Sequence, residues 1–231
     1  MKKLIARTAS LAAATALLAG GAATLTAPEA SANRVCNGVI SNTTISGNVT
    51  VPTGGNCTLR AVTVRGNVEA RANSTLRIEG GRVTGDVKGN NTALMRLTDN
   101  VVNGNVQVDR PGTTTLTRST VGGDAQFKYN RGTVTLVSSR ISGDVQAEDD
   151  VRRLDVTGTT IGGDLQMKKS REGNLNRNTV RGNLQVETNR ALVRINDNRV
   201  SGNLQCKENR PAPVGARNVV SGNKEGQCRT F

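Results

Sequence analysis

Carboxylates that recur at one spacing are the first candidates for chemistry in this chain of 231 residues. Asp124, Asp144 and Asp164 each follow a glycine, and 20 residues separate one from the next. If the fold stacks them, such packed carboxylates could bind Ca²⁺ or share protons in catalysis. Other copies of the same position carry Asn, and both residue types suit turns. The sequence therefore favours a structural role for this column, with calcium binding and catalysis as alternatives.

Arginines that recur in the same part of the chain suggest a second kind of chemistry, the binding of anions. They stand eight or nine positions after successive repeat glycines, as Arg131, Arg152, Arg171, Arg190 and Arg210. Stacked like charges repel one another unless acidic neighbours in the protein or external anions neutralise them. Residues 33–231 carry 28 basic and 17 acidic side chains, a net charge of +11, which suits a polyanionic partner. This edge is predicted either to be neutralised internally or to bind a polyanion.

Two outward-facing polar columns are expected to keep the repeats in register. Gln stands three positions after the glycine in six consecutive copies: Gln107, Gln126, Gln146, Gln166, Gln185 and Gln205. Stacked amides can hydrogen-bond along a rod, and a flat polar platform for sugars is the alternative. Five positions after the glycine the charge alternates, through Asp109, Lys128, Glu148, Lys168, Glu187 and Lys207. Opposite charges on neighbouring strands stabilise by ~0.2–1 kcal/mol per pair.

Composition argues against several functional classes. The sequence has no His, so neither a Ser-His nor a Cys-His nucleophile can form. The strict repeat spacing leaves no room for the long insertions that usually build a glycosidase groove. With one Tyr and two Phe, the chain lacks the interleaved aromatic residues of a dedicated single-strand nucleic-acid site. We predict a non-enzymatic protein that uses no cofactor.

Four cysteines favour two disulfides. Cys36 and Cys57 are 21 residues apart, and Cys206 and Cys228 are 22 apart, so each pair spans about one repeat. We predict the bonds Cys36–Cys57 and Cys206–Cys228, each joining the two outermost layers at one end. Loops of this length would each contribute ~3 kcal/mol in the chain-entropy model. A zinc site is the weaker alternative, because it needs His or closely spaced Cys pairs.

A repeat defines the elements that must position these side chains. Gly followed by Asn or Asp recurs every 19 or 20 residues, at Gly47, Gly66, Gly85, Gly104, Gly123, Gly143, Gly163, Gly182, Gly202 and Gly222. Aliphatic residues form columns two before, two after and seven before the glycine, and they alternate with polar residues as in half-buried strands. Such a period indicates one unit stacked on copies of itself. We predict an all-β, single-domain parallel β-helix of about ten coils over residues 33–231, with the right-handed form favoured.

Residues 1–32 are predicted to be a signal peptide. Lys2, Lys3 and Arg7 precede an apolar stretch over residues 11–23, and Ala30-Ser31-Ala32 matches a cleavage site before Asn33. The apolar run is too short for a transmembrane helix, so no membrane span is expected in the mature chain. Export would also favour disulfide formation.

The C-terminal motifs carry a resemblance. Residues 202–206 read GNLQC, residues 208–213 read ENRPAP, and residues 222–228 read GNKEGQC. This ending resembles a group of small secreted actinobacterial β-helix repeat proteins. The resemblance implies export and a β-helical repeat domain, and it implies no activity. More distantly, the layering is similar to right-handed parallel β-helix proteins and to bactofilins, whose β-helices polymerise end to end; the Cys-stapled ends distinguish this chain from bactofilins.

Together these features predict a secreted structural or binding protein of the cell envelope or extracellular space. Its expected partner is an anionic cell-wall polymer or polysaccharide, held by the polar and basic outer columns. One alternative is a polysaccharide lyase or hydrolase that relies on Asp124, Asp144 and Asp164. The other is a self-assembling surface scaffold.

Overall fold

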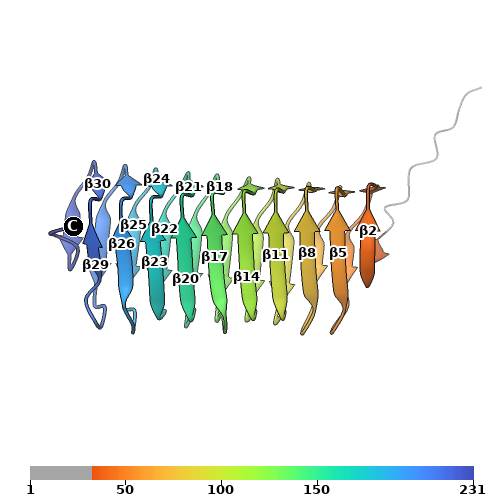
Figure 1. Ribbon diagram of the computed structural model, residues 1–231, viewed down its shortest axis with the longest axis horizontal. Helices are drawn as coiled ribbons and strands as arrows, with labels where there is room; N and C mark the ends of the chain where they lie inside the picture. The colour runs from red at the N-terminus through yellow and green to blue at the C-terminus, as the bar shows by residue number, and fades with distance from the viewer. Residues whose placement is uncertain (1–32) are drawn as a thin grey trace, which may run out of the picture.

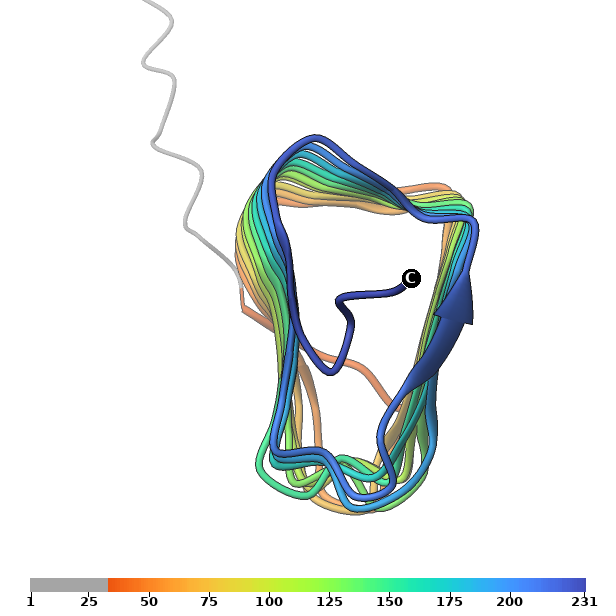
Figure 2. The ribbon, with the colours of Figure 1, turned by 90° about the vertical axis from the view of Figure 1, so that its left-hand side faces the viewer.

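The chain winds into a rod of stacked coils (Figure 1). The computed structural model describes residues 33–231, so the predicted signal peptide lies outside the described residues. Nearly every coil contributes one strand to each of three parallel sheets, which confirms the predicted all-β parallel β-helix. Seen from its C-terminal end, the chain runs counter-clockwise as it advances toward the viewer, so the coil is right-handed (Figure 2). In the described part of the chain no helix is long and apolar enough to cross a membrane.

Sheet A is formed by the residues that directly follow the Gly-Asn or Gly-Asp pairs. Its inner face carries the predicted column from Val49 to Leu204 and a second buried column two residues later, from Val51 to Cys206. Its eleven strands, in spatial order, are β1 (Arg34–Val35), β4 (Val49–Val51), β7 (Val68–Ala70), β10 (Val87–Asn90), β13 (Val106–Asp109), β16 (Ala125–Lys128), β19 (Val145–Glu148), β22 (Leu165–Lys168), β25 (Leu184–Glu187), β28 (Leu204–Lys207) and β31 (Lys224–Gly226).

Sheet B faces sheet A across the core. The predicted column seven before the glycine, from Ile40 to Ile195, is buried on its inner face. Its ten strands are β2 (Gly38–Ser41), β5 (Asn56–Arg60), β8 (Thr75–Glu79), β11 (Leu94–Thr98), β14 (Thr113–Thr117), β17 (Thr133–Val137), β20 (Arg153–Thr157), β23 (Glu172–Asn176), β26 (Val193–Asn196) and β29 (Val214–Ala216).

Sheet C closes the third side with strands of two residues. The second residue of each strand belongs to the predicted β-branched column, and the column joins the same continuous core as those of sheets A and B. Its ten strands are β3 (Thr44–Ile45), β6 (Thr63–Val64), β9 (Arg82–Val83), β12 (Val101–Val102), β15 (Thr120–Val121), β18 (Arg140–Ile141), β21 (Thr160–Ile161), β24 (Thr179–Val180), β27 (Arg199–Val200) and β30 (Val219–Val220). Burying each branched aliphatic side chain stabilises by ~1.5–3 kcal/mol.

The Gly-Asn and Gly-Asp pairs join neighbouring coils. The backbone N–H of Asp144 donates to Asp124 Oδ1 at 2.9 Å, and that of Asp164 donates to Asp144 Oδ1 at 2.8 Å. Only an acceptor oxygen is needed, so Asn and Asp serve equally well. The preceding residue must be glycine because a Cβ at Gly163 would collide with Asp144 Oδ1. The repeated pair is therefore a structural joint between coils.

Two columns of polar side chains are buried at the bends, and the sequence analysis did not identify them. Between sheets B and C the column contains Asn100, Ser119, Ser139, Thr159, Asn178, Asn198 and Asn218. The Asn198 Nδ2 donates to the Leu175 carbonyl at 2.7 Å and to Asn218 Oδ1 at 3.0 Å. A second column between sheets A and B includes Ser170, Asn189 and Asn209. These side chains satisfy backbone groups that would otherwise be buried without a partner where the strands end.

Both predicted disulfides are present. Cys36 is bonded to Cys57 and Cys206 to Cys228, with sequence separations of 21 and 22 residues. Each bond joins a terminal coil to its neighbour, as the repeat spacing predicted. Two disulfides are compatible with an extracellular protein.

The chain itself crosses both ends of the rod. Only two residues separate β1 from β2, and this short link cuts across the N-terminal end (Figure 2). After β31 the chain folds back over the other end, where the Phe231 ring lies against Gly215 and the Lys224 ammonium donates to the Phe231 carbonyl. Arg34 is in register with Val49, and Lys224 is in register with Leu204. Each terminal strand therefore places a cation where the other coils place an apolar residue.

Candidate functional site

The five predicted arginines lie in one row along the turns between sheets A and B, at the narrow lower corner of the cross-section in Figure 2. Each follows the buried residue at the bend, and its backbone N–H donates to the carbonyl of the corresponding bend residue one coil back. The N···O distances are 2.9 Å for Arg131 to Pro111, 2.9 Å for Arg152 to Asn130, 3.0 Å for Arg171 to Val151, 2.9 Å for Arg190 to Ser170 and 2.8 Å for Arg210 to Asn189. The ladder of coils thus fixes the spacing of the row.

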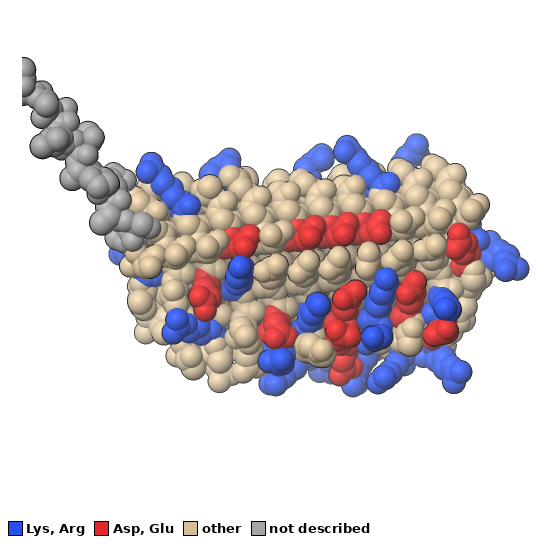
Figure 3. Space-filling model, turned by 180° about the vertical axis from the view of Figure 1, so that it is seen from behind, with Lys and Arg blue, Asp and Glu red and all other residues tan. Residues whose placement is uncertain are grey.

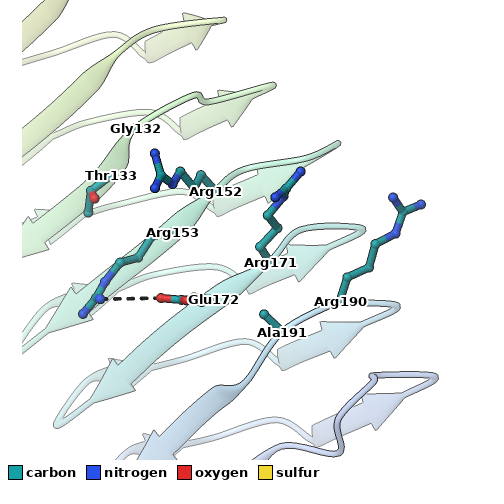
Figure 4. A pocket seen from close by; sticks show the side chains of 8 residues that line it. All are labelled: Gly132, Thr133, Arg152, Arg153, Arg171, Glu172, Arg190 and Ala191. Atoms are coloured by element: carbon teal, nitrogen blue, oxygen red, sulfur yellow. Dashed lines mark ion pairs between the residues drawn. The ribbon is translucent and has the colours of Figure 1, made fainter.

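The arginine side chains line a series of adjoining hollows. The largest, of about 820 Å³, is lined by Arg152, Arg171 and Arg190 together with Arg153 and Glu172. In Figure 4 Arg171 and Arg190 extend in nearly the same direction from successive turns, Arg152 extends to the other side, and Arg153 is paired with Glu172. A hollow of about 510 Å³ shares Arg152 and Arg171 and adds Arg131. A third, of about 330 Å³, contains Arg190 and Arg210.

Internal ion pairs neutralise only part of this row. Arg171 Nε lies 3.1 Å from Asp150 Oδ1, with more than half of each side chain exposed. Within residues 33–231, Arg131, Arg152, Arg190 and Arg210 form no ion pair with an acidic side chain. The expectation that acidic neighbours neutralise the row therefore holds only at Arg171. We call the five arginines the arginine edge.

Two residues that the sequence analysis missed lie beside the arginine edge. Tyr129 and Arg110 line the same hollow as Arg131, and the Arg110 guanidinium carbon lies 5.7 Å from the centre of the Tyr129 ring. Both stand six positions after a repeat glycine, outside the column in which the arginines recur. Their shared offset was the signal that could have connected them.

The aspartate column is used by the fold. Figure 3 shows a row of acidic side chains parallel to the long axis of the rod. Asp124, Asp144 and Asp164 each accept a backbone N–H of the next coil through Oδ1. The second carboxylate oxygens of Asp144 and Asp164 accept from Gln146 at 3.5 Å and from Gln166 at 3.4 Å. Among the described residues no group of three or more acidic or cysteine side chains could hold a metal ion.

The glutamine column is in register through all six coils but is bonded along the rod only in part. Gln107 donates to Gln126 at 3.5 Å and Gln185 donates to Gln205 at 3.0 Å. In the middle of the rod, Gln146 and Gln166 donate instead to the aspartates of their own coils. The predicted amide ladder is therefore interrupted where Asp replaces Asn, because a carboxylate is the stronger acceptor.

The alternating charges form separate pairs instead of a continuous ladder. Lys128 lies 3.9 Å from Glu148, and Lys168 lies 3.8 Å from Glu187. At the two ends of the column, Asp109 pairs with Arg110 and Lys207 with Glu208, each at 3.5 Å. Neighbouring turn residues pair with the charges at both ends of the column, so ion pairs between coils form only at Lys128–Glu148 and Lys168–Glu187 among the six residues.

Asp86 stands at the equivalent position of an earlier coil, directly after Gly85. The backbone N–H of Asn105 donates to its carboxylate at 2.9 Å and Lys88 lies 3.2 Å away. These contacts lower the pKa of Asp86, although partial burial opposes the shift. Because the folded-state pKa is depressed, the stabilising contribution is present at neutral pH and is lost as pH falls through that pKa.

Replacing Asp86→Asn should therefore reduce the acid sensitivity of the protein. The amide oxygen still accepts from Asn105, but it does not titrate. We expect the difference in free energy of unfolding between about pH 7 and about pH 3 to be smaller in the variant than in the wild type. Urea titrations at the two pH values would measure it. An unchanged difference would show that this carboxylate does not contribute to the acid response.

No family model, curated protein or solved structure matches this chain.

Proposed function

We propose that the protein is exported and binds an anionic polymer along the arginine edge, as a non-enzymatic structural or binding protein of the cell envelope or extracellular space. One observation carries the proposal. Five arginines stand in consecutive coils, are held in a row by backbone hydrogen bonds, and only Arg171 has an acidic partner among the described side chains.

The length of the row favours a polymer over a small anion. Neighbouring coils lie about 4.8 Å apart, so five arginines extend over about 19 Å. A single carboxylate, sulfate or phosphate group would neutralise only one or two of them. Guanidinium groups match all three of these anions in planar, bidentate geometry. A linear polyanion that lies along the rod would relieve the repulsion between all five.

Binding is proposed in preference to catalysis because the aspartate column is occupied by structural contacts. The Oδ1 atoms of Asp124, Asp144 and Asp164 each accept a backbone hydrogen bond from the next coil. Protonation or movement of such a carboxylate would weaken the joint between coils. The disulfides and the expected signal peptide support the exported location.

Salt-dependent retention on polyanion columns tests this function. The triple variant Arg171→Glu, Arg190→Glu, Arg210→Glu should elute from immobilised polygalacturonate or polyphosphate at much lower salt than the wild type. Losing three contacts should make the slope of log K against log[salt] shallower by about 2 to 3.

A matched control makes the same charge change on another face. Arg82→Glu, Arg140→Glu and Arg199→Glu alter the outer side of sheet C, away from the turns that carry the arginine edge. The proposal fails if both triple variants lose retention equally, or if elution of the wild type does not depend on salt.

A further inference from the structure

One aromatic side chain lies beside the arginine edge. Tyr129 is the only tyrosine of the sequence, and 46% of its surface is exposed. The other large apolar residues exposed in the described chain are Val35, Val39, Val214 and Val219, all in the first or last coil. Within the body of the rod, Tyr129 is therefore the one exposed ring, and it lies two residues before Arg131.

The backbone of Tyr129 belongs to the same ladder of coils as that of the arginines. Its backbone N–H donates to the Asp149 carbonyl at 3.0 Å, and the Arg110 guanidinium carbon lies 5.7 Å from its ring centre. This geometry is a cation–π contact, and Tyr129 lines the 510 Å³ hollow together with Arg131 and Arg152. A ring held in this way gives a ligand an apolar surface beside a row of cations.

Carboxylates stand among the arginines of the same hollows. Asp150 lines the hollow of about 510 Å³ that contains Tyr129, and Glu172 lines the hollow of about 820 Å³ together with Thr133. A carboxylate repels any anionic group, but it accepts hydrogen bonds from hydroxyl groups, which a polysaccharide carries along its length and a polyphosphate chain does not. The mixture of cations, hydrogen-bond acceptors and one ring fits a ligand that carries acidic groups, hydroxyl groups and sugar rings together.

We propose that the polymer bound by the arginine edge is an acidic polysaccharide that lies parallel to the axis of the rod. One sugar ring packs against Tyr129, its carboxylate or sulfate groups contact Arg131, Arg152 and Arg190, and its hydroxyl groups donate to Asp150 and Glu172. This inference rests on the proposed function. Polyphosphate has no ring to contact Tyr129, and a single-stranded nucleic acid needs several stacking residues where this edge offers one.

The test compares three polyanions by isothermal titration calorimetry at low salt: oligogalacturonates of increasing length, polyphosphate and oligothymidylate. Tyr129 has a φ of 51°, so Tyr129→Asn removes the ring with a residue that tolerates this backbone. Tyr129→Phe keeps the ring as the matched control. We expect Tyr129→Asn to weaken oligogalacturonate binding about fivefold to tenfold, and Tyr129→Phe to leave it unchanged.

Polyphosphate affinity should be the same in the wild type and in both variants. Oligogalacturonate affinity should rise with length and level off once the oligomer covers the five coils. Tighter binding of polyphosphate or oligothymidylate, or an equal loss for every polymer in Tyr129→Asn, would overturn the polysaccharide inference and leave polyanion binding standing. If none of the three polymers binds, the proposed function itself fails. Far-UV circular dichroism establishes that both variants fold.

Discussion

Replacing Arg34→Val together with Lys224→Leu should convert the protein into end-to-end assemblies. The two cations occupy the register positions of the inner column of sheet A, beside Val49 and Leu204. If one rod stacked on the end of another in the same register, Lys224 of the first would face Arg34 of the second. Charged residues at inward positions are a known protection of exposed strand edges against pairing.

Removing both charges would leave an apolar side chain on each terminal strand of sheet A, and within residues 33–231 neither strand has a neighbour on its outer side. A contact between two different ends does not close on itself, so it would build filaments instead of dimers. Light scattering should show a mass that rises with protein concentration, and electron microscopy should show rods many times the length of one molecule.

The control keeps the charge change but moves it away from the ends. Arg140→Val with Lys88→Leu alters outward positions in the body of the rod and should leave the mass unchanged. A double variant at Arg34 and Lys224 that keeps the mass of the wild type at every concentration would refute the role of these cations. The scaffold alternative predicts instead that the wild type already assembles.

A second large effect is expected from the buried asparagines. Asn198 is 1% exposed; its Nδ2 donates to Leu175 and Asn218, and its Oδ1 accepts from the backbone and side-chain N–H groups of Asn178. Asn198→Val would leave several buried groups without a partner. Each such group costs about 1–3 kcal/mol, so the free energy of unfolding should fall by about 3 kcal/mol or more.

Asn130 provides the matched control at the other bend. It is fully buried, yet neither its Oδ1 nor its Nδ2 has a hydrogen-bond partner. The corresponding residues of the neighbouring coils are Pro111, which has no N–H to donate, and Val151, which has no acceptor side chain. Asn130→Val removes two unpaired polar atoms, so we expect unchanged or slightly higher stability.

Urea unfolding of the two variants would measure the difference. The contrast separates hydrogen bonding from packing, because the same change of side chain is made in both places. Equal destabilisation of the two variants would show that packing, and not the asparagine column, determines stability at the bends.

The repeat predicted the fold and the disulfides well because the same positions of the repeat are buried in every coil. Every coil lies on a copy of itself, so an inward position recurs at a constant offset from the glycine. The second inner column of sheet A escaped notice because its members range from Gly89 to Phe127. The size of the inward side chain at this position differs from coil to coil, so no single residue type marks the column. Asparagine is typical of exposed turns, so its residue type alone does not indicate that Asn198 is buried.

The arginine edge was predictable because each arginine follows the bend at nearly the same offset. Tyr129 and Arg110 share an offset of six from their repeat glycines, but the residue type at that offset varies from coil to coil, so neither was singled out, and the contact between their side chains also depends on the local path of each turn. The dependence on local turn geometry also explains why the alternating charges do not pair continuously along the rod. Asp109 and Lys207 lie in register with opposite charges, but Arg110 and Glu208 are adjacent in sequence and pair with them instead.

The joints between coils all have the same direction: each Asn or Asp accepts from the coil that follows it. Deletion of one whole repeat therefore removes one backbone N–H donor and one Oδ1 acceptor together. The two coils that then become neighbours can form the same hydrogen bond with each other. Coil number can change without leaving an orphaned group in this column. Gain or loss of a repeat within residues 123–222 would then lengthen or shorten the row of arginines by one step. In evolutionary terms, duplication or deletion of whole repeats can therefore change the length of the arginine edge in steps of one coil.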